Sequence, residues 1–131
     1  MATFPFELVA PERLLVSGDV EAVQLPGAEG DFEVMAGHAP LLALLGPGII
    51  TVRGGAVGNR RLFIDGGFCD VNDAGCTVLA EAATPIDSAD AAAEIDRLIA
   101  SAEEAAASIE PGERDEADRR IATLRTVRAS I

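Results

Sequence analysis

The feature that most constrains the fold of this chain is an abrupt change of composition near Pro85. All five Phe, twelve of the thirteen Gly, both Cys and the single His precede this proline. The 47 residues from position 85 onward hold twelve Ala and no aromatic residue. Glycine is typical of turns and alanine of helices. The sequence therefore predicts two structural units, residues 1–84 and residues 85–131.

Residues 1–84 have the pattern of short strands separated by turns. Apolar residues alternate from Phe4 to Ala10, as a strand with one buried face requires. Three further apolar runs are predicted strands: 49–52, 61–64 and 76–79. Turns are predicted at Pro26-Gly27 (type II), Gly46-Pro47-Gly48, Gly54-Gly55, Gly66-Gly67 and Asn72-Asp73-Ala74-Gly75. This spacing favours an antiparallel β-sandwich or a flattened barrel.

Residues 85–131 have the pattern of two amphipathic helices. One apolar stripe recurs at steps of three and four from Ile95 to Ile109, and a second runs from Ala117 to Ile131. Oxygens of Asp87, Ser88 and Asp90 are placed to cap the first helix, and Glu110-Pro111-Gly112 is expected to end it. Two helices of about 30 and 24 Å then form an antiparallel hairpin. The predicted fold class is α+β, mainly β.

The charge of the chain excludes several classes of partner. Twenty-two Asp and Glu stand against ten Arg, Lys is absent, and the net charge is -12. This excess of carboxylates disfavours binding to nucleic acid and to anionic lipid. Without Lys, neither a Walker-type phosphate loop nor a Schiff-base mechanism can be built. The first residues lack the basic and apolar regions of a signal peptide, and Gly and Pro interrupt the longest weakly charged run, 36–52. We therefore expect a soluble cytosolic protein without direct lipid insertion.

His38 is the sole candidate for a general base. Nucleophilic catalysis needs an activated nucleophile beside its base and a third group that orients the base, and the sequence places no Ser or Cys for this role. A zinc site built from His38, Cys69 and Cys76 would lack a fourth ligand and the usual close cysteine spacing. A turn or interface histidine and buried thiols are favoured instead. We expect no catalytic residue, no metal and no cofactor.

The segment from Asp70 to Glu81 shares four positions with the calcium loop of an EF-hand. With Asp70 as the first position, Asn72 is third, Gly75 sixth and Glu81 twelfth, but Ala74 stands where the fifth ligand is needed. The flanking residues favour strands, whereas an EF-hand needs helices. A hairpin turn with exposed acids is therefore predicted here.

Three longer motifs occur in order in the first unit. They are Pro26-Gly27-Ala28-Glu29-Gly30-Asp31-Phe32, Gly37-His38-Ala39-Pro40-Leu41-Leu42 and Gly66-Gly67-Phe68-Cys69-Asp70-Val71. Together with the composition change, they make the whole chain resemble the epsilon subunit of the F-type ATP synthase, which is homologous to the mitochondrial delta subunit. That family joins an N-terminal β-sandwich to a C-terminal helix hairpin.

The resemblance implies a non-catalytic rotor subunit that couples c-ring rotation to ATP synthesis through the gamma subunit. The sandwich would bind gamma and the c-ring, at the cytoplasmic face of the bacterial inner membrane. The residues that match the gamma side are His38, Ala39, Pro40, Leu41 and Leu42. The loop that matches the c-ring side is Glu29, Gly30 and Asp31.

The resemblance also implies a regulatory role for the hairpin, which restrains ATP hydrolysis in bacterial relatives by extending into the alpha and beta subunits. The basic residues that would meet beta are Arg119, Arg120, Arg125 and Arg128. Some relatives bind ATP through an Ile/Leu-Asp-x-x-Arg-Ala segment. Ile95, Asp96 and Ala100 match it here, but Ile99 occupies the Arg position. An apolar side chain cannot replace a guanidinium, so weak or no ATP binding is expected.

Two features of the second helix limit the inhibition of ATP hydrolysis that is expected of the hairpin. The second helix is only about sixteen residues long and contains no Lys, so strong inhibition by extension is not expected.

Two other classes of function remain. A free-standing β-sandwich sensor of calcium or a nucleotide would depend on Asp70, Asn72, Glu81 and Asp96. An enzyme, the weakest alternative, would depend on His38.

Overall fold

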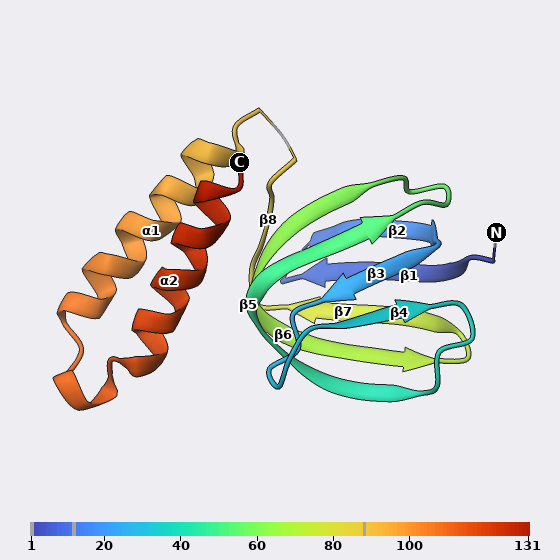
Figure 1. The fold of residues 1–131 in the computed structure, drawn as a ribbon, viewed down its shortest axis with the longest axis horizontal. Coiled ribbons are helices and arrows are strands. Elements are labelled where there is room, and N and C mark those ends of the chain that lie inside the picture. The colour runs from blue at the N-terminus through green and yellow to red at the C-terminus, as the bar shows by residue number, and fades with distance from the viewer. Residues whose placement is uncertain (1, 12, 88) are drawn as a thin grey trace. The chain divides into compact units, whose positions relative to one another are not determined.

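A computed structural model describes residues 2–11, 13–87 and 89–131 of the chain (Figure 1). The chain forms two compact units, Met1–Pro85 and Ile86–Ile131. The strands of the first unit are β1 (Phe4–Ala10), β2 (Arg13–Val20), β3 (Ala22–Leu25), β4 (Phe32–Met35), β5 (Leu41–Arg53), β6 (Arg60–Asn72), β7 (Gly75–Ala80) and β8 (Ala83–Pro85). The second unit contains α1 (Ala91–Ala107), the 3-10 turn η1 (Pro111–Glu113) and α2 (Asp115–Ala129).

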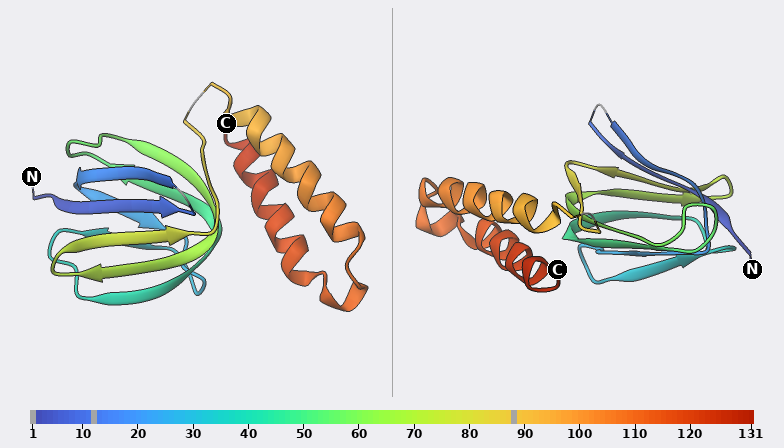
Figure 2. Two further views of the ribbon diagram at one scale, coloured as in Figure 1. Left: turned by 180° about the vertical axis from the view of Figure 1, so that it is seen from behind. Right: turned by 90° about the horizontal axis from the view of Figure 1, so that it is seen from above.

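The eight strands form one folded sheet whose two layers make a sandwich (Figure 2). The strand order is β2-β1-β7-β6-β5-β3-β4, and β8 also pairs with β6. The predicted sandwich is thus confirmed. The alternative of a barrel is wrong, because β2 and β4 lie at opposite ends of this order and the sheet is open. The sheet is also not wholly antiparallel, since β1 and β7 pair in parallel.

The two longest strands, β5 and β6, belong to both layers. The second half of β5 pairs with β3 at 51–53, whereas the first half of β6 pairs with β8 at 62–64 and its second half pairs with β7 at 67–72. The turns predicted at 46–48 and 66–67 are therefore wrong. Pairing continues across both sites, from Leu45 with Gly67 to Pro47 with Asp65. Glycine and proline bend the two strands here without reversing them.

The predicted type II turn at Pro26-Gly27 is also wrong, because Gly27 does not have the positive φ that this turn requires. Gly27 instead forms an isolated bridge with Leu45. The turn follows directly, and the N–H of Gly30 closes it by donating to the carbonyl of Gly27 at 3.1 Å. The turns at Gly54-Gly55 and at 72–75 are confirmed, since they connect β5 to β6 and β6 to β7.

The core of the first unit consists of apolar side chains that alternate along the strands. Phe4, Phe6 and Leu8 are buried as predicted, while Pro5 and Glu7 between them are exposed. Fully buried residues from the other strands complete this core: Val20, Val23, Leu25, Ile50, Val52, Leu62, Ile64, Cys69 and Val78. The first unit therefore has a hydrophobic core of its own.

The second unit is the predicted antiparallel helix hairpin, with helices of 17 and 15 residues. Ile95, Ala102 and Ala106 of the α1 stripe are buried, but Ala105 is exposed. Ile121, Leu124 and Val127 of the α2 stripe are buried. Asp90 is the N-cap residue of α1, yet its side chain makes no capping hydrogen bond to a described residue, and Ser88 lies outside the described residues.

The end of α1 lies slightly before the predicted stop. The helix ends at Ala107, and Pro111 begins the short η1 turn. Neither helix is long and apolar enough to cross a membrane, as far as the described residues extend.

Candidate functional site

A cleft of about 420 Å³ lies where the start of β1 meets two loops of the sandwich unit. Its walls come from the start of β1, the end of β4 with the following loop, and the turn between β6 and β7. His38, Ala39 and Pro40, three of the five residues predicted to contact gamma, line this cleft. The other two, Leu41 and Leu42, begin β5.

The loop that carries His38 is held by local hydrogen bonds. Gly37 has φ of +83°, a conformation that favours glycine. The backbone N–H of His38 donates to the carbonyl of Met35 at 3.1 Å, and its Nδ1 donates to the carbonyl of Ala39 at 2.7 Å. His38 is exposed, and its side chain donates to a backbone carbonyl rather than to a nucleophile. This geometry suits a contact residue better than a general base.

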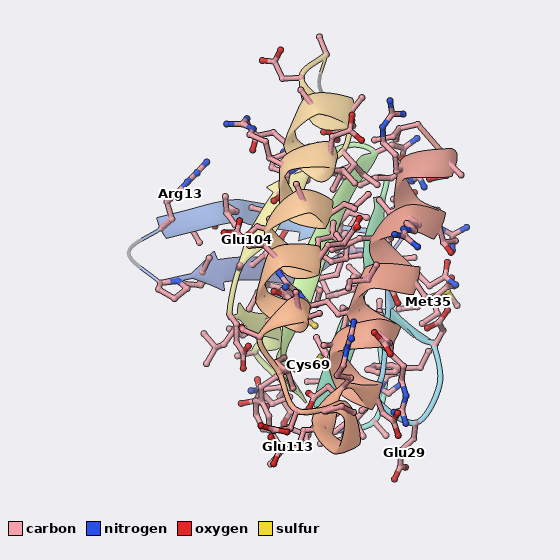
Figure 3. The ribbon with its side chains drawn as sticks, turned by 90° about the vertical axis from the view of Figure 1, so that its left-hand side faces the viewer. Arg13, Glu29, Met35, Cys69, Glu104 and Glu113 are labelled. Carbon is pink, nitrogen blue, oxygen red and sulfur yellow. The ribbon has the colours of Figure 1, made fainter. Side chains whose placement is uncertain are left out.

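The loop predicted to meet the c-ring is a tight exposed turn. Glu29, Gly30 and Asp31 are all exposed, and Gly30 has φ of +137°. Two backbone hydrogen bonds of 2.9 Å fix the turn to β5: Ala28 donates to Leu44, and Gly46 donates to Pro26. Figure 3 places Glu29 and Met35 on the opposite side of the sandwich unit from Arg13. The turn therefore presents two carboxylates from a backbone fixed by the sheet.

The segment compared with a calcium loop is the β6–β7 hairpin turn, as predicted. The Oδ1 of Asn72 accepts a hydrogen bond of 2.8 Å from the N–H of Ala74, and the Nδ2 of Asn72 lies 3.3 Å from Oδ1 of Asp70. Asn72 thus uses its side chain within the turn. Within the described residues, no three His, Cys, Asp or Glu side chains come together as a metal site.

Cys69 and Cys76 lie on neighbouring strands with their Sγ atoms 3.7 Å apart, and both are buried. The hydrogen bond between the thiols and their burial raise the pKa of Cys76 well above its ordinary value. The same hydrogen bond lowers the pKa of Cys69. His38 does not join them in a metal-binding group of described residues.

In the helix hairpin, two of the predicted beta-contact residues pair with acids of the opposite helix. Arg128 Nε lies 2.9 Å from Asp96 Oδ1, and Arg125 Nη2 lies 3.2 Å from Glu103 Oε1. Asp96 is the acid of the degenerate ATP segment, of which Ile95 is buried and Ala100 exposed. Arg119 is exposed and Arg120 is partly buried. The structure thus pairs Arg128, a predicted contact to beta, with Asp96, a residue of the degenerate ATP segment.

A group of exposed apolar side chains on the sandwich contains only one residue that was predicted as functional, Leu42. It includes Leu42 and Leu44 of β5, Phe68 of β6, Leu79 of β7 and Leu14 of β2. The run Leu41-Leu42-Ala43-Leu44-Leu45 holds a signal for it, because a strand that is apolar at every position has two apolar faces. One of these faces is covered by the core, whereas Leu42 and Leu44 point outward.

Comparisons with known proteins agree with this architecture. Residues 3–86 match the family model described as ATP synthase, Delta/Epsilon chain, beta-sandwich domain. The chain is 43% identical to the ATP synthase epsilon chain of Mesorhizobium japonicum over 98% of this chain and 95% of that protein. It is 44% identical to ATP synthase epsilon chain 1 of Nitrobacter hamburgensis over 100% of this chain and 96% of that protein.

Two solved structures share the fold. One is a chain of the Euglena gracilis mitochondrial ATP synthase in an OSCP/F1/c-ring assembly, with TM-score 0.76 and 23% identity over 99% of this chain and 82% of that chain. The other comes from the central stalk and c-ring of the Tetrahymena thermophila enzyme, with TM-score 0.68 and 13% identity over 95% of this chain and 96% of that chain.

Proposed function

The chain belongs to the ATP synthase epsilon chain family, and from this membership we propose that it is the central-stalk subunit that couples c-ring rotation to ATP synthesis through gamma. The observation that carries the proposal is the match to epsilon chains over almost the entire chain, through both the sandwich and the hairpin. The protein is then part of an enzyme complex and performs no chemistry itself. It would sit peripherally at the cytoplasmic face of the bacterial membrane.

Two surfaces of the sandwich have the properties that this role requires. The loop of His38 to Pro40, with Leu41 and Leu42 after it, offers exposed polar and apolar atoms to gamma. The turn of Glu29, Gly30 and Asp31 offers two carboxylates to the polar loops of the c-ring. Both surfaces are short connections held by a rigid sheet, which suits contacts that transmit torque.

The hairpin supplies a regulatory role. Its interface contains small Ala side chains, which bury little apolar area, and its exposed ion pairs contribute little net stability. A folded and an extended state can then differ by only a few kcal/mol, as a switch requires. Arg119, Arg120, Arg125 and Arg128 are the proposed contacts to beta; extension would exchange the partners of Arg125 and Arg128.

ATP is proposed to bind weakly or not at all to this hairpin. Ile99 stands where the ATP-binding segment has Arg, and Asp96 already pairs with Arg128. Calorimetry with the purified chain should detect no submillimolar binding of ATP. Submillimolar binding that Asp96→Ala abolishes would contradict the proposal.

The role is tested by titrating epsilon-depleted headpiece from the same organism with the full chain and with a version that ends at Pro85. Gamma binding and ATP hydrolysis are measured together. Binding by both forms with inhibition by the full chain alone supports a coupling subunit with a regulatory hairpin. Binding by both without inhibition leaves a structural coupler. If neither form binds gamma, the proposed role is wrong and the ligand-binding sandwich becomes the better hypothesis.

A further inference from the structure

The cleft beside the loop of His38 has an apolar lining and the size of a ligand site. Its volume of about 420 Å³ lies within the range of about 300–1,000 Å³ that is typical of pockets for small molecules. Of its apolar lining residues, Phe4, Val34 and Val71 are buried in the sandwich, whereas Met35 is 53% exposed. Met35 therefore offers apolar surface to a molecule that enters the cleft.

Two polar groups at the cleft accept hydrogen bonds. Asp73, in the turn between β6 and β7, is exposed, and its carboxylate has no hydrogen bond or ion pair with another described residue. Nδ1 of His38 donates to the carbonyl of Ala39, so Nε2 of the neutral ring is an acceptor. Both groups suit a ligand that donates hydrogen bonds.

The charge around the cleft favours a cation. Among the described residues that line it, Asp73 contributes a carboxylate, and neither Lys nor Arg is present. Asn72 has an amide donor, but its Nδ2 lies 3.3 Å from Oδ1 of Asp70, and its Oδ1 accepts from the N–H of Ala74. The net charge of -12 adds to the attraction of a cation. An anionic ligand would be repelled and would find no basic side chain here.

A metal ion is a poor match to this cleft, whereas a primary ammonium group fits its acceptors. Hard cations such as Ca²⁺ need about six to eight oxygen ligands. No three His, Cys, Asp or Glu side chains in the described part of the chain gather as a metal site. An ammonium group has three donors, which the carboxylate of Asp73, Nε2 of His38 and water can satisfy. An alkyl chain attached to this group would bury apolar surface against Met35.

We propose that this cleft binds a small organic cation, a primary alkylammonium. Its charged head would pair with Asp73 and donate to His38, and its alkyl chain would cover Met35. The proposed coupling role requires no small ligand, so this binding would be a second property of the sandwich.

The test uses the isotope-labelled full chain, titrated with hexylammonium chloride while the amide chemical shifts are followed by NMR. The largest changes should occur at Gly37, His38, Asp73 and Gly75, which line the cleft. Hexanol has the same alkyl chain without the charge. It should bind about fivefold more weakly, because it cannot form the ion pair with Asp73.

Two pairs of variants separate the charged and the apolar contact. Asp73→Asn should weaken the binding of hexylammonium about fivefold. Asp19→Asn, which removes an exposed carboxylate of β2 outside the lining, should leave the affinity unchanged. Met35→Gln should weaken binding about twofold, because apolar contact is lost, whereas Leu14→Gln, the same kind of change on β2, should have no effect. The amide spectrum of each variant verifies the fold.

Three outcomes would overturn the inference. Equal affinity of the Asp73→Asn variant, or equal binding of hexanol, would show that the cleft does not select a cation. Shift changes of equal size at exposed acids of the hairpin, such as Glu104 and Glu116, would show only general attraction to an acidic protein. Binding of a lysine-containing tripeptide at the cleft without binding of hexylammonium would assign the cleft to a protein side chain.

Discussion

Arg128 and Asp96 join the two helices of the hairpin through a hydrogen bond of 2.9 Å from Nε to Oδ1. These residues come from sets that sequence reasoning assigned to different partners, beta for Arg128 and ATP for Asp96. In the folded hairpin each is the partner of the other. An extended hairpin would have to replace this ion pair, so the pair favours the folded state.

The Asp96–Arg128 pair should contribute only modestly to stability. Asp96 is exposed and Arg128 is partly buried at the surface, and surface pairs of this kind contribute about 0.2–1 kcal/mol. In a double-mutant cycle, Asp96→Asn and Arg128→Gln should show a coupling in this range, measured by urea unfolding at 222 nm. Asp96→Asn with Arg125→Gln should be additive, because Arg125 pairs with Glu103 instead. Additivity of the first pair would show that the ion pair is not formed in solution.

Phe6 and Phe68 should respond very differently to truncation. Phe6 is fully buried, so Phe6→Ala should lower the free energy of unfolding of the sandwich by about 3–5 kcal/mol. Phe68 is partly exposed, and Phe68→Ala should cost less than half as much as Phe6→Ala. Denaturant unfolding of the full chain measures both. Equal losses would mean that the face bearing Phe68 is covered in the isolated chain.

Gly27→Ala should destabilise the turn that carries Glu29. A Cβ at position 27 would lie 2.4 Å from the carbonyl oxygen of Gly30, so the turn would have to open. We expect a loss of about 1–3 kcal/mol, in the range typical of strained substitutions. Gly112→Ala has open space around its new methyl group and should be close to neutral. Thermal unfolding compares the two, and a neutral Gly27→Ala would contradict the observed turn.

The two thiols should be unreactive in the folded protein. Both are buried, and the raised pKa of Cys76 keeps its thiol protonated. A thiol-specific reagent at pH 8 should react with neither cysteine in the native chain and with both in urea. Because the unfolded Cys76 loses its proton near pH 9 while the folded one keeps it, the contribution of Cys76 to stability should fall as the pH rises through this value, and the lowered pKa of Cys69 should act in the opposite direction. Rapid reaction of one native thiol would contradict the burial.

Residues 1–85 should fold without the hairpin. Every member of the sandwich core cluster and all eight strands lie within this range. Deleting the hairpin therefore removes no strand of the sheet. The isolated sandwich should unfold cooperatively, whereas a peptide of residues 86–131 should be only partly helical, since short isolated helices are marginal. Circular dichroism and calorimetry test both. A sandwich without a cooperative transition would show that its core is insufficient.

Sequence reasoning identified the elements where a local pattern decides the structure. The alternation in β1 and the three-and-four spacing of the helices report directly which face is buried. It failed at Gly46-Pro47-Gly48 and Gly66-Gly67, because the same residues can reverse a chain or bend a strand. The choice depends on pairing between residues about twenty positions apart, such as Leu45 with Gly67, which no local window contains.

In the candidate site, too, the features set by a local pattern could be predicted and those set by distant pairing could not. The exposure of His38 and of Glu29 follows from turn motifs, and a turn at the surface is a local property. The exposed apolar side chains on the sandwich could not be predicted as one group, because they lie on different strands and become neighbours only through the register of the sheet, as Leu44, Phe68 and Leu79 do. The Asp96–Arg128 pair likewise depends on how the two helices align.

The two bent strands, β5 and β6, run through both layers of the sandwich without interruption. In an ordinary sandwich the layers are joined by loops and by side-chain packing, so a sideways force can slide one layer over the other. Here such a slip would require stretching two continuous backbones, whose covalent bonds are far stiffer than packed side chains. A protein built in this way resists shear. It would lose little of the applied work to internal deformation, which is a useful property in a rotating shaft.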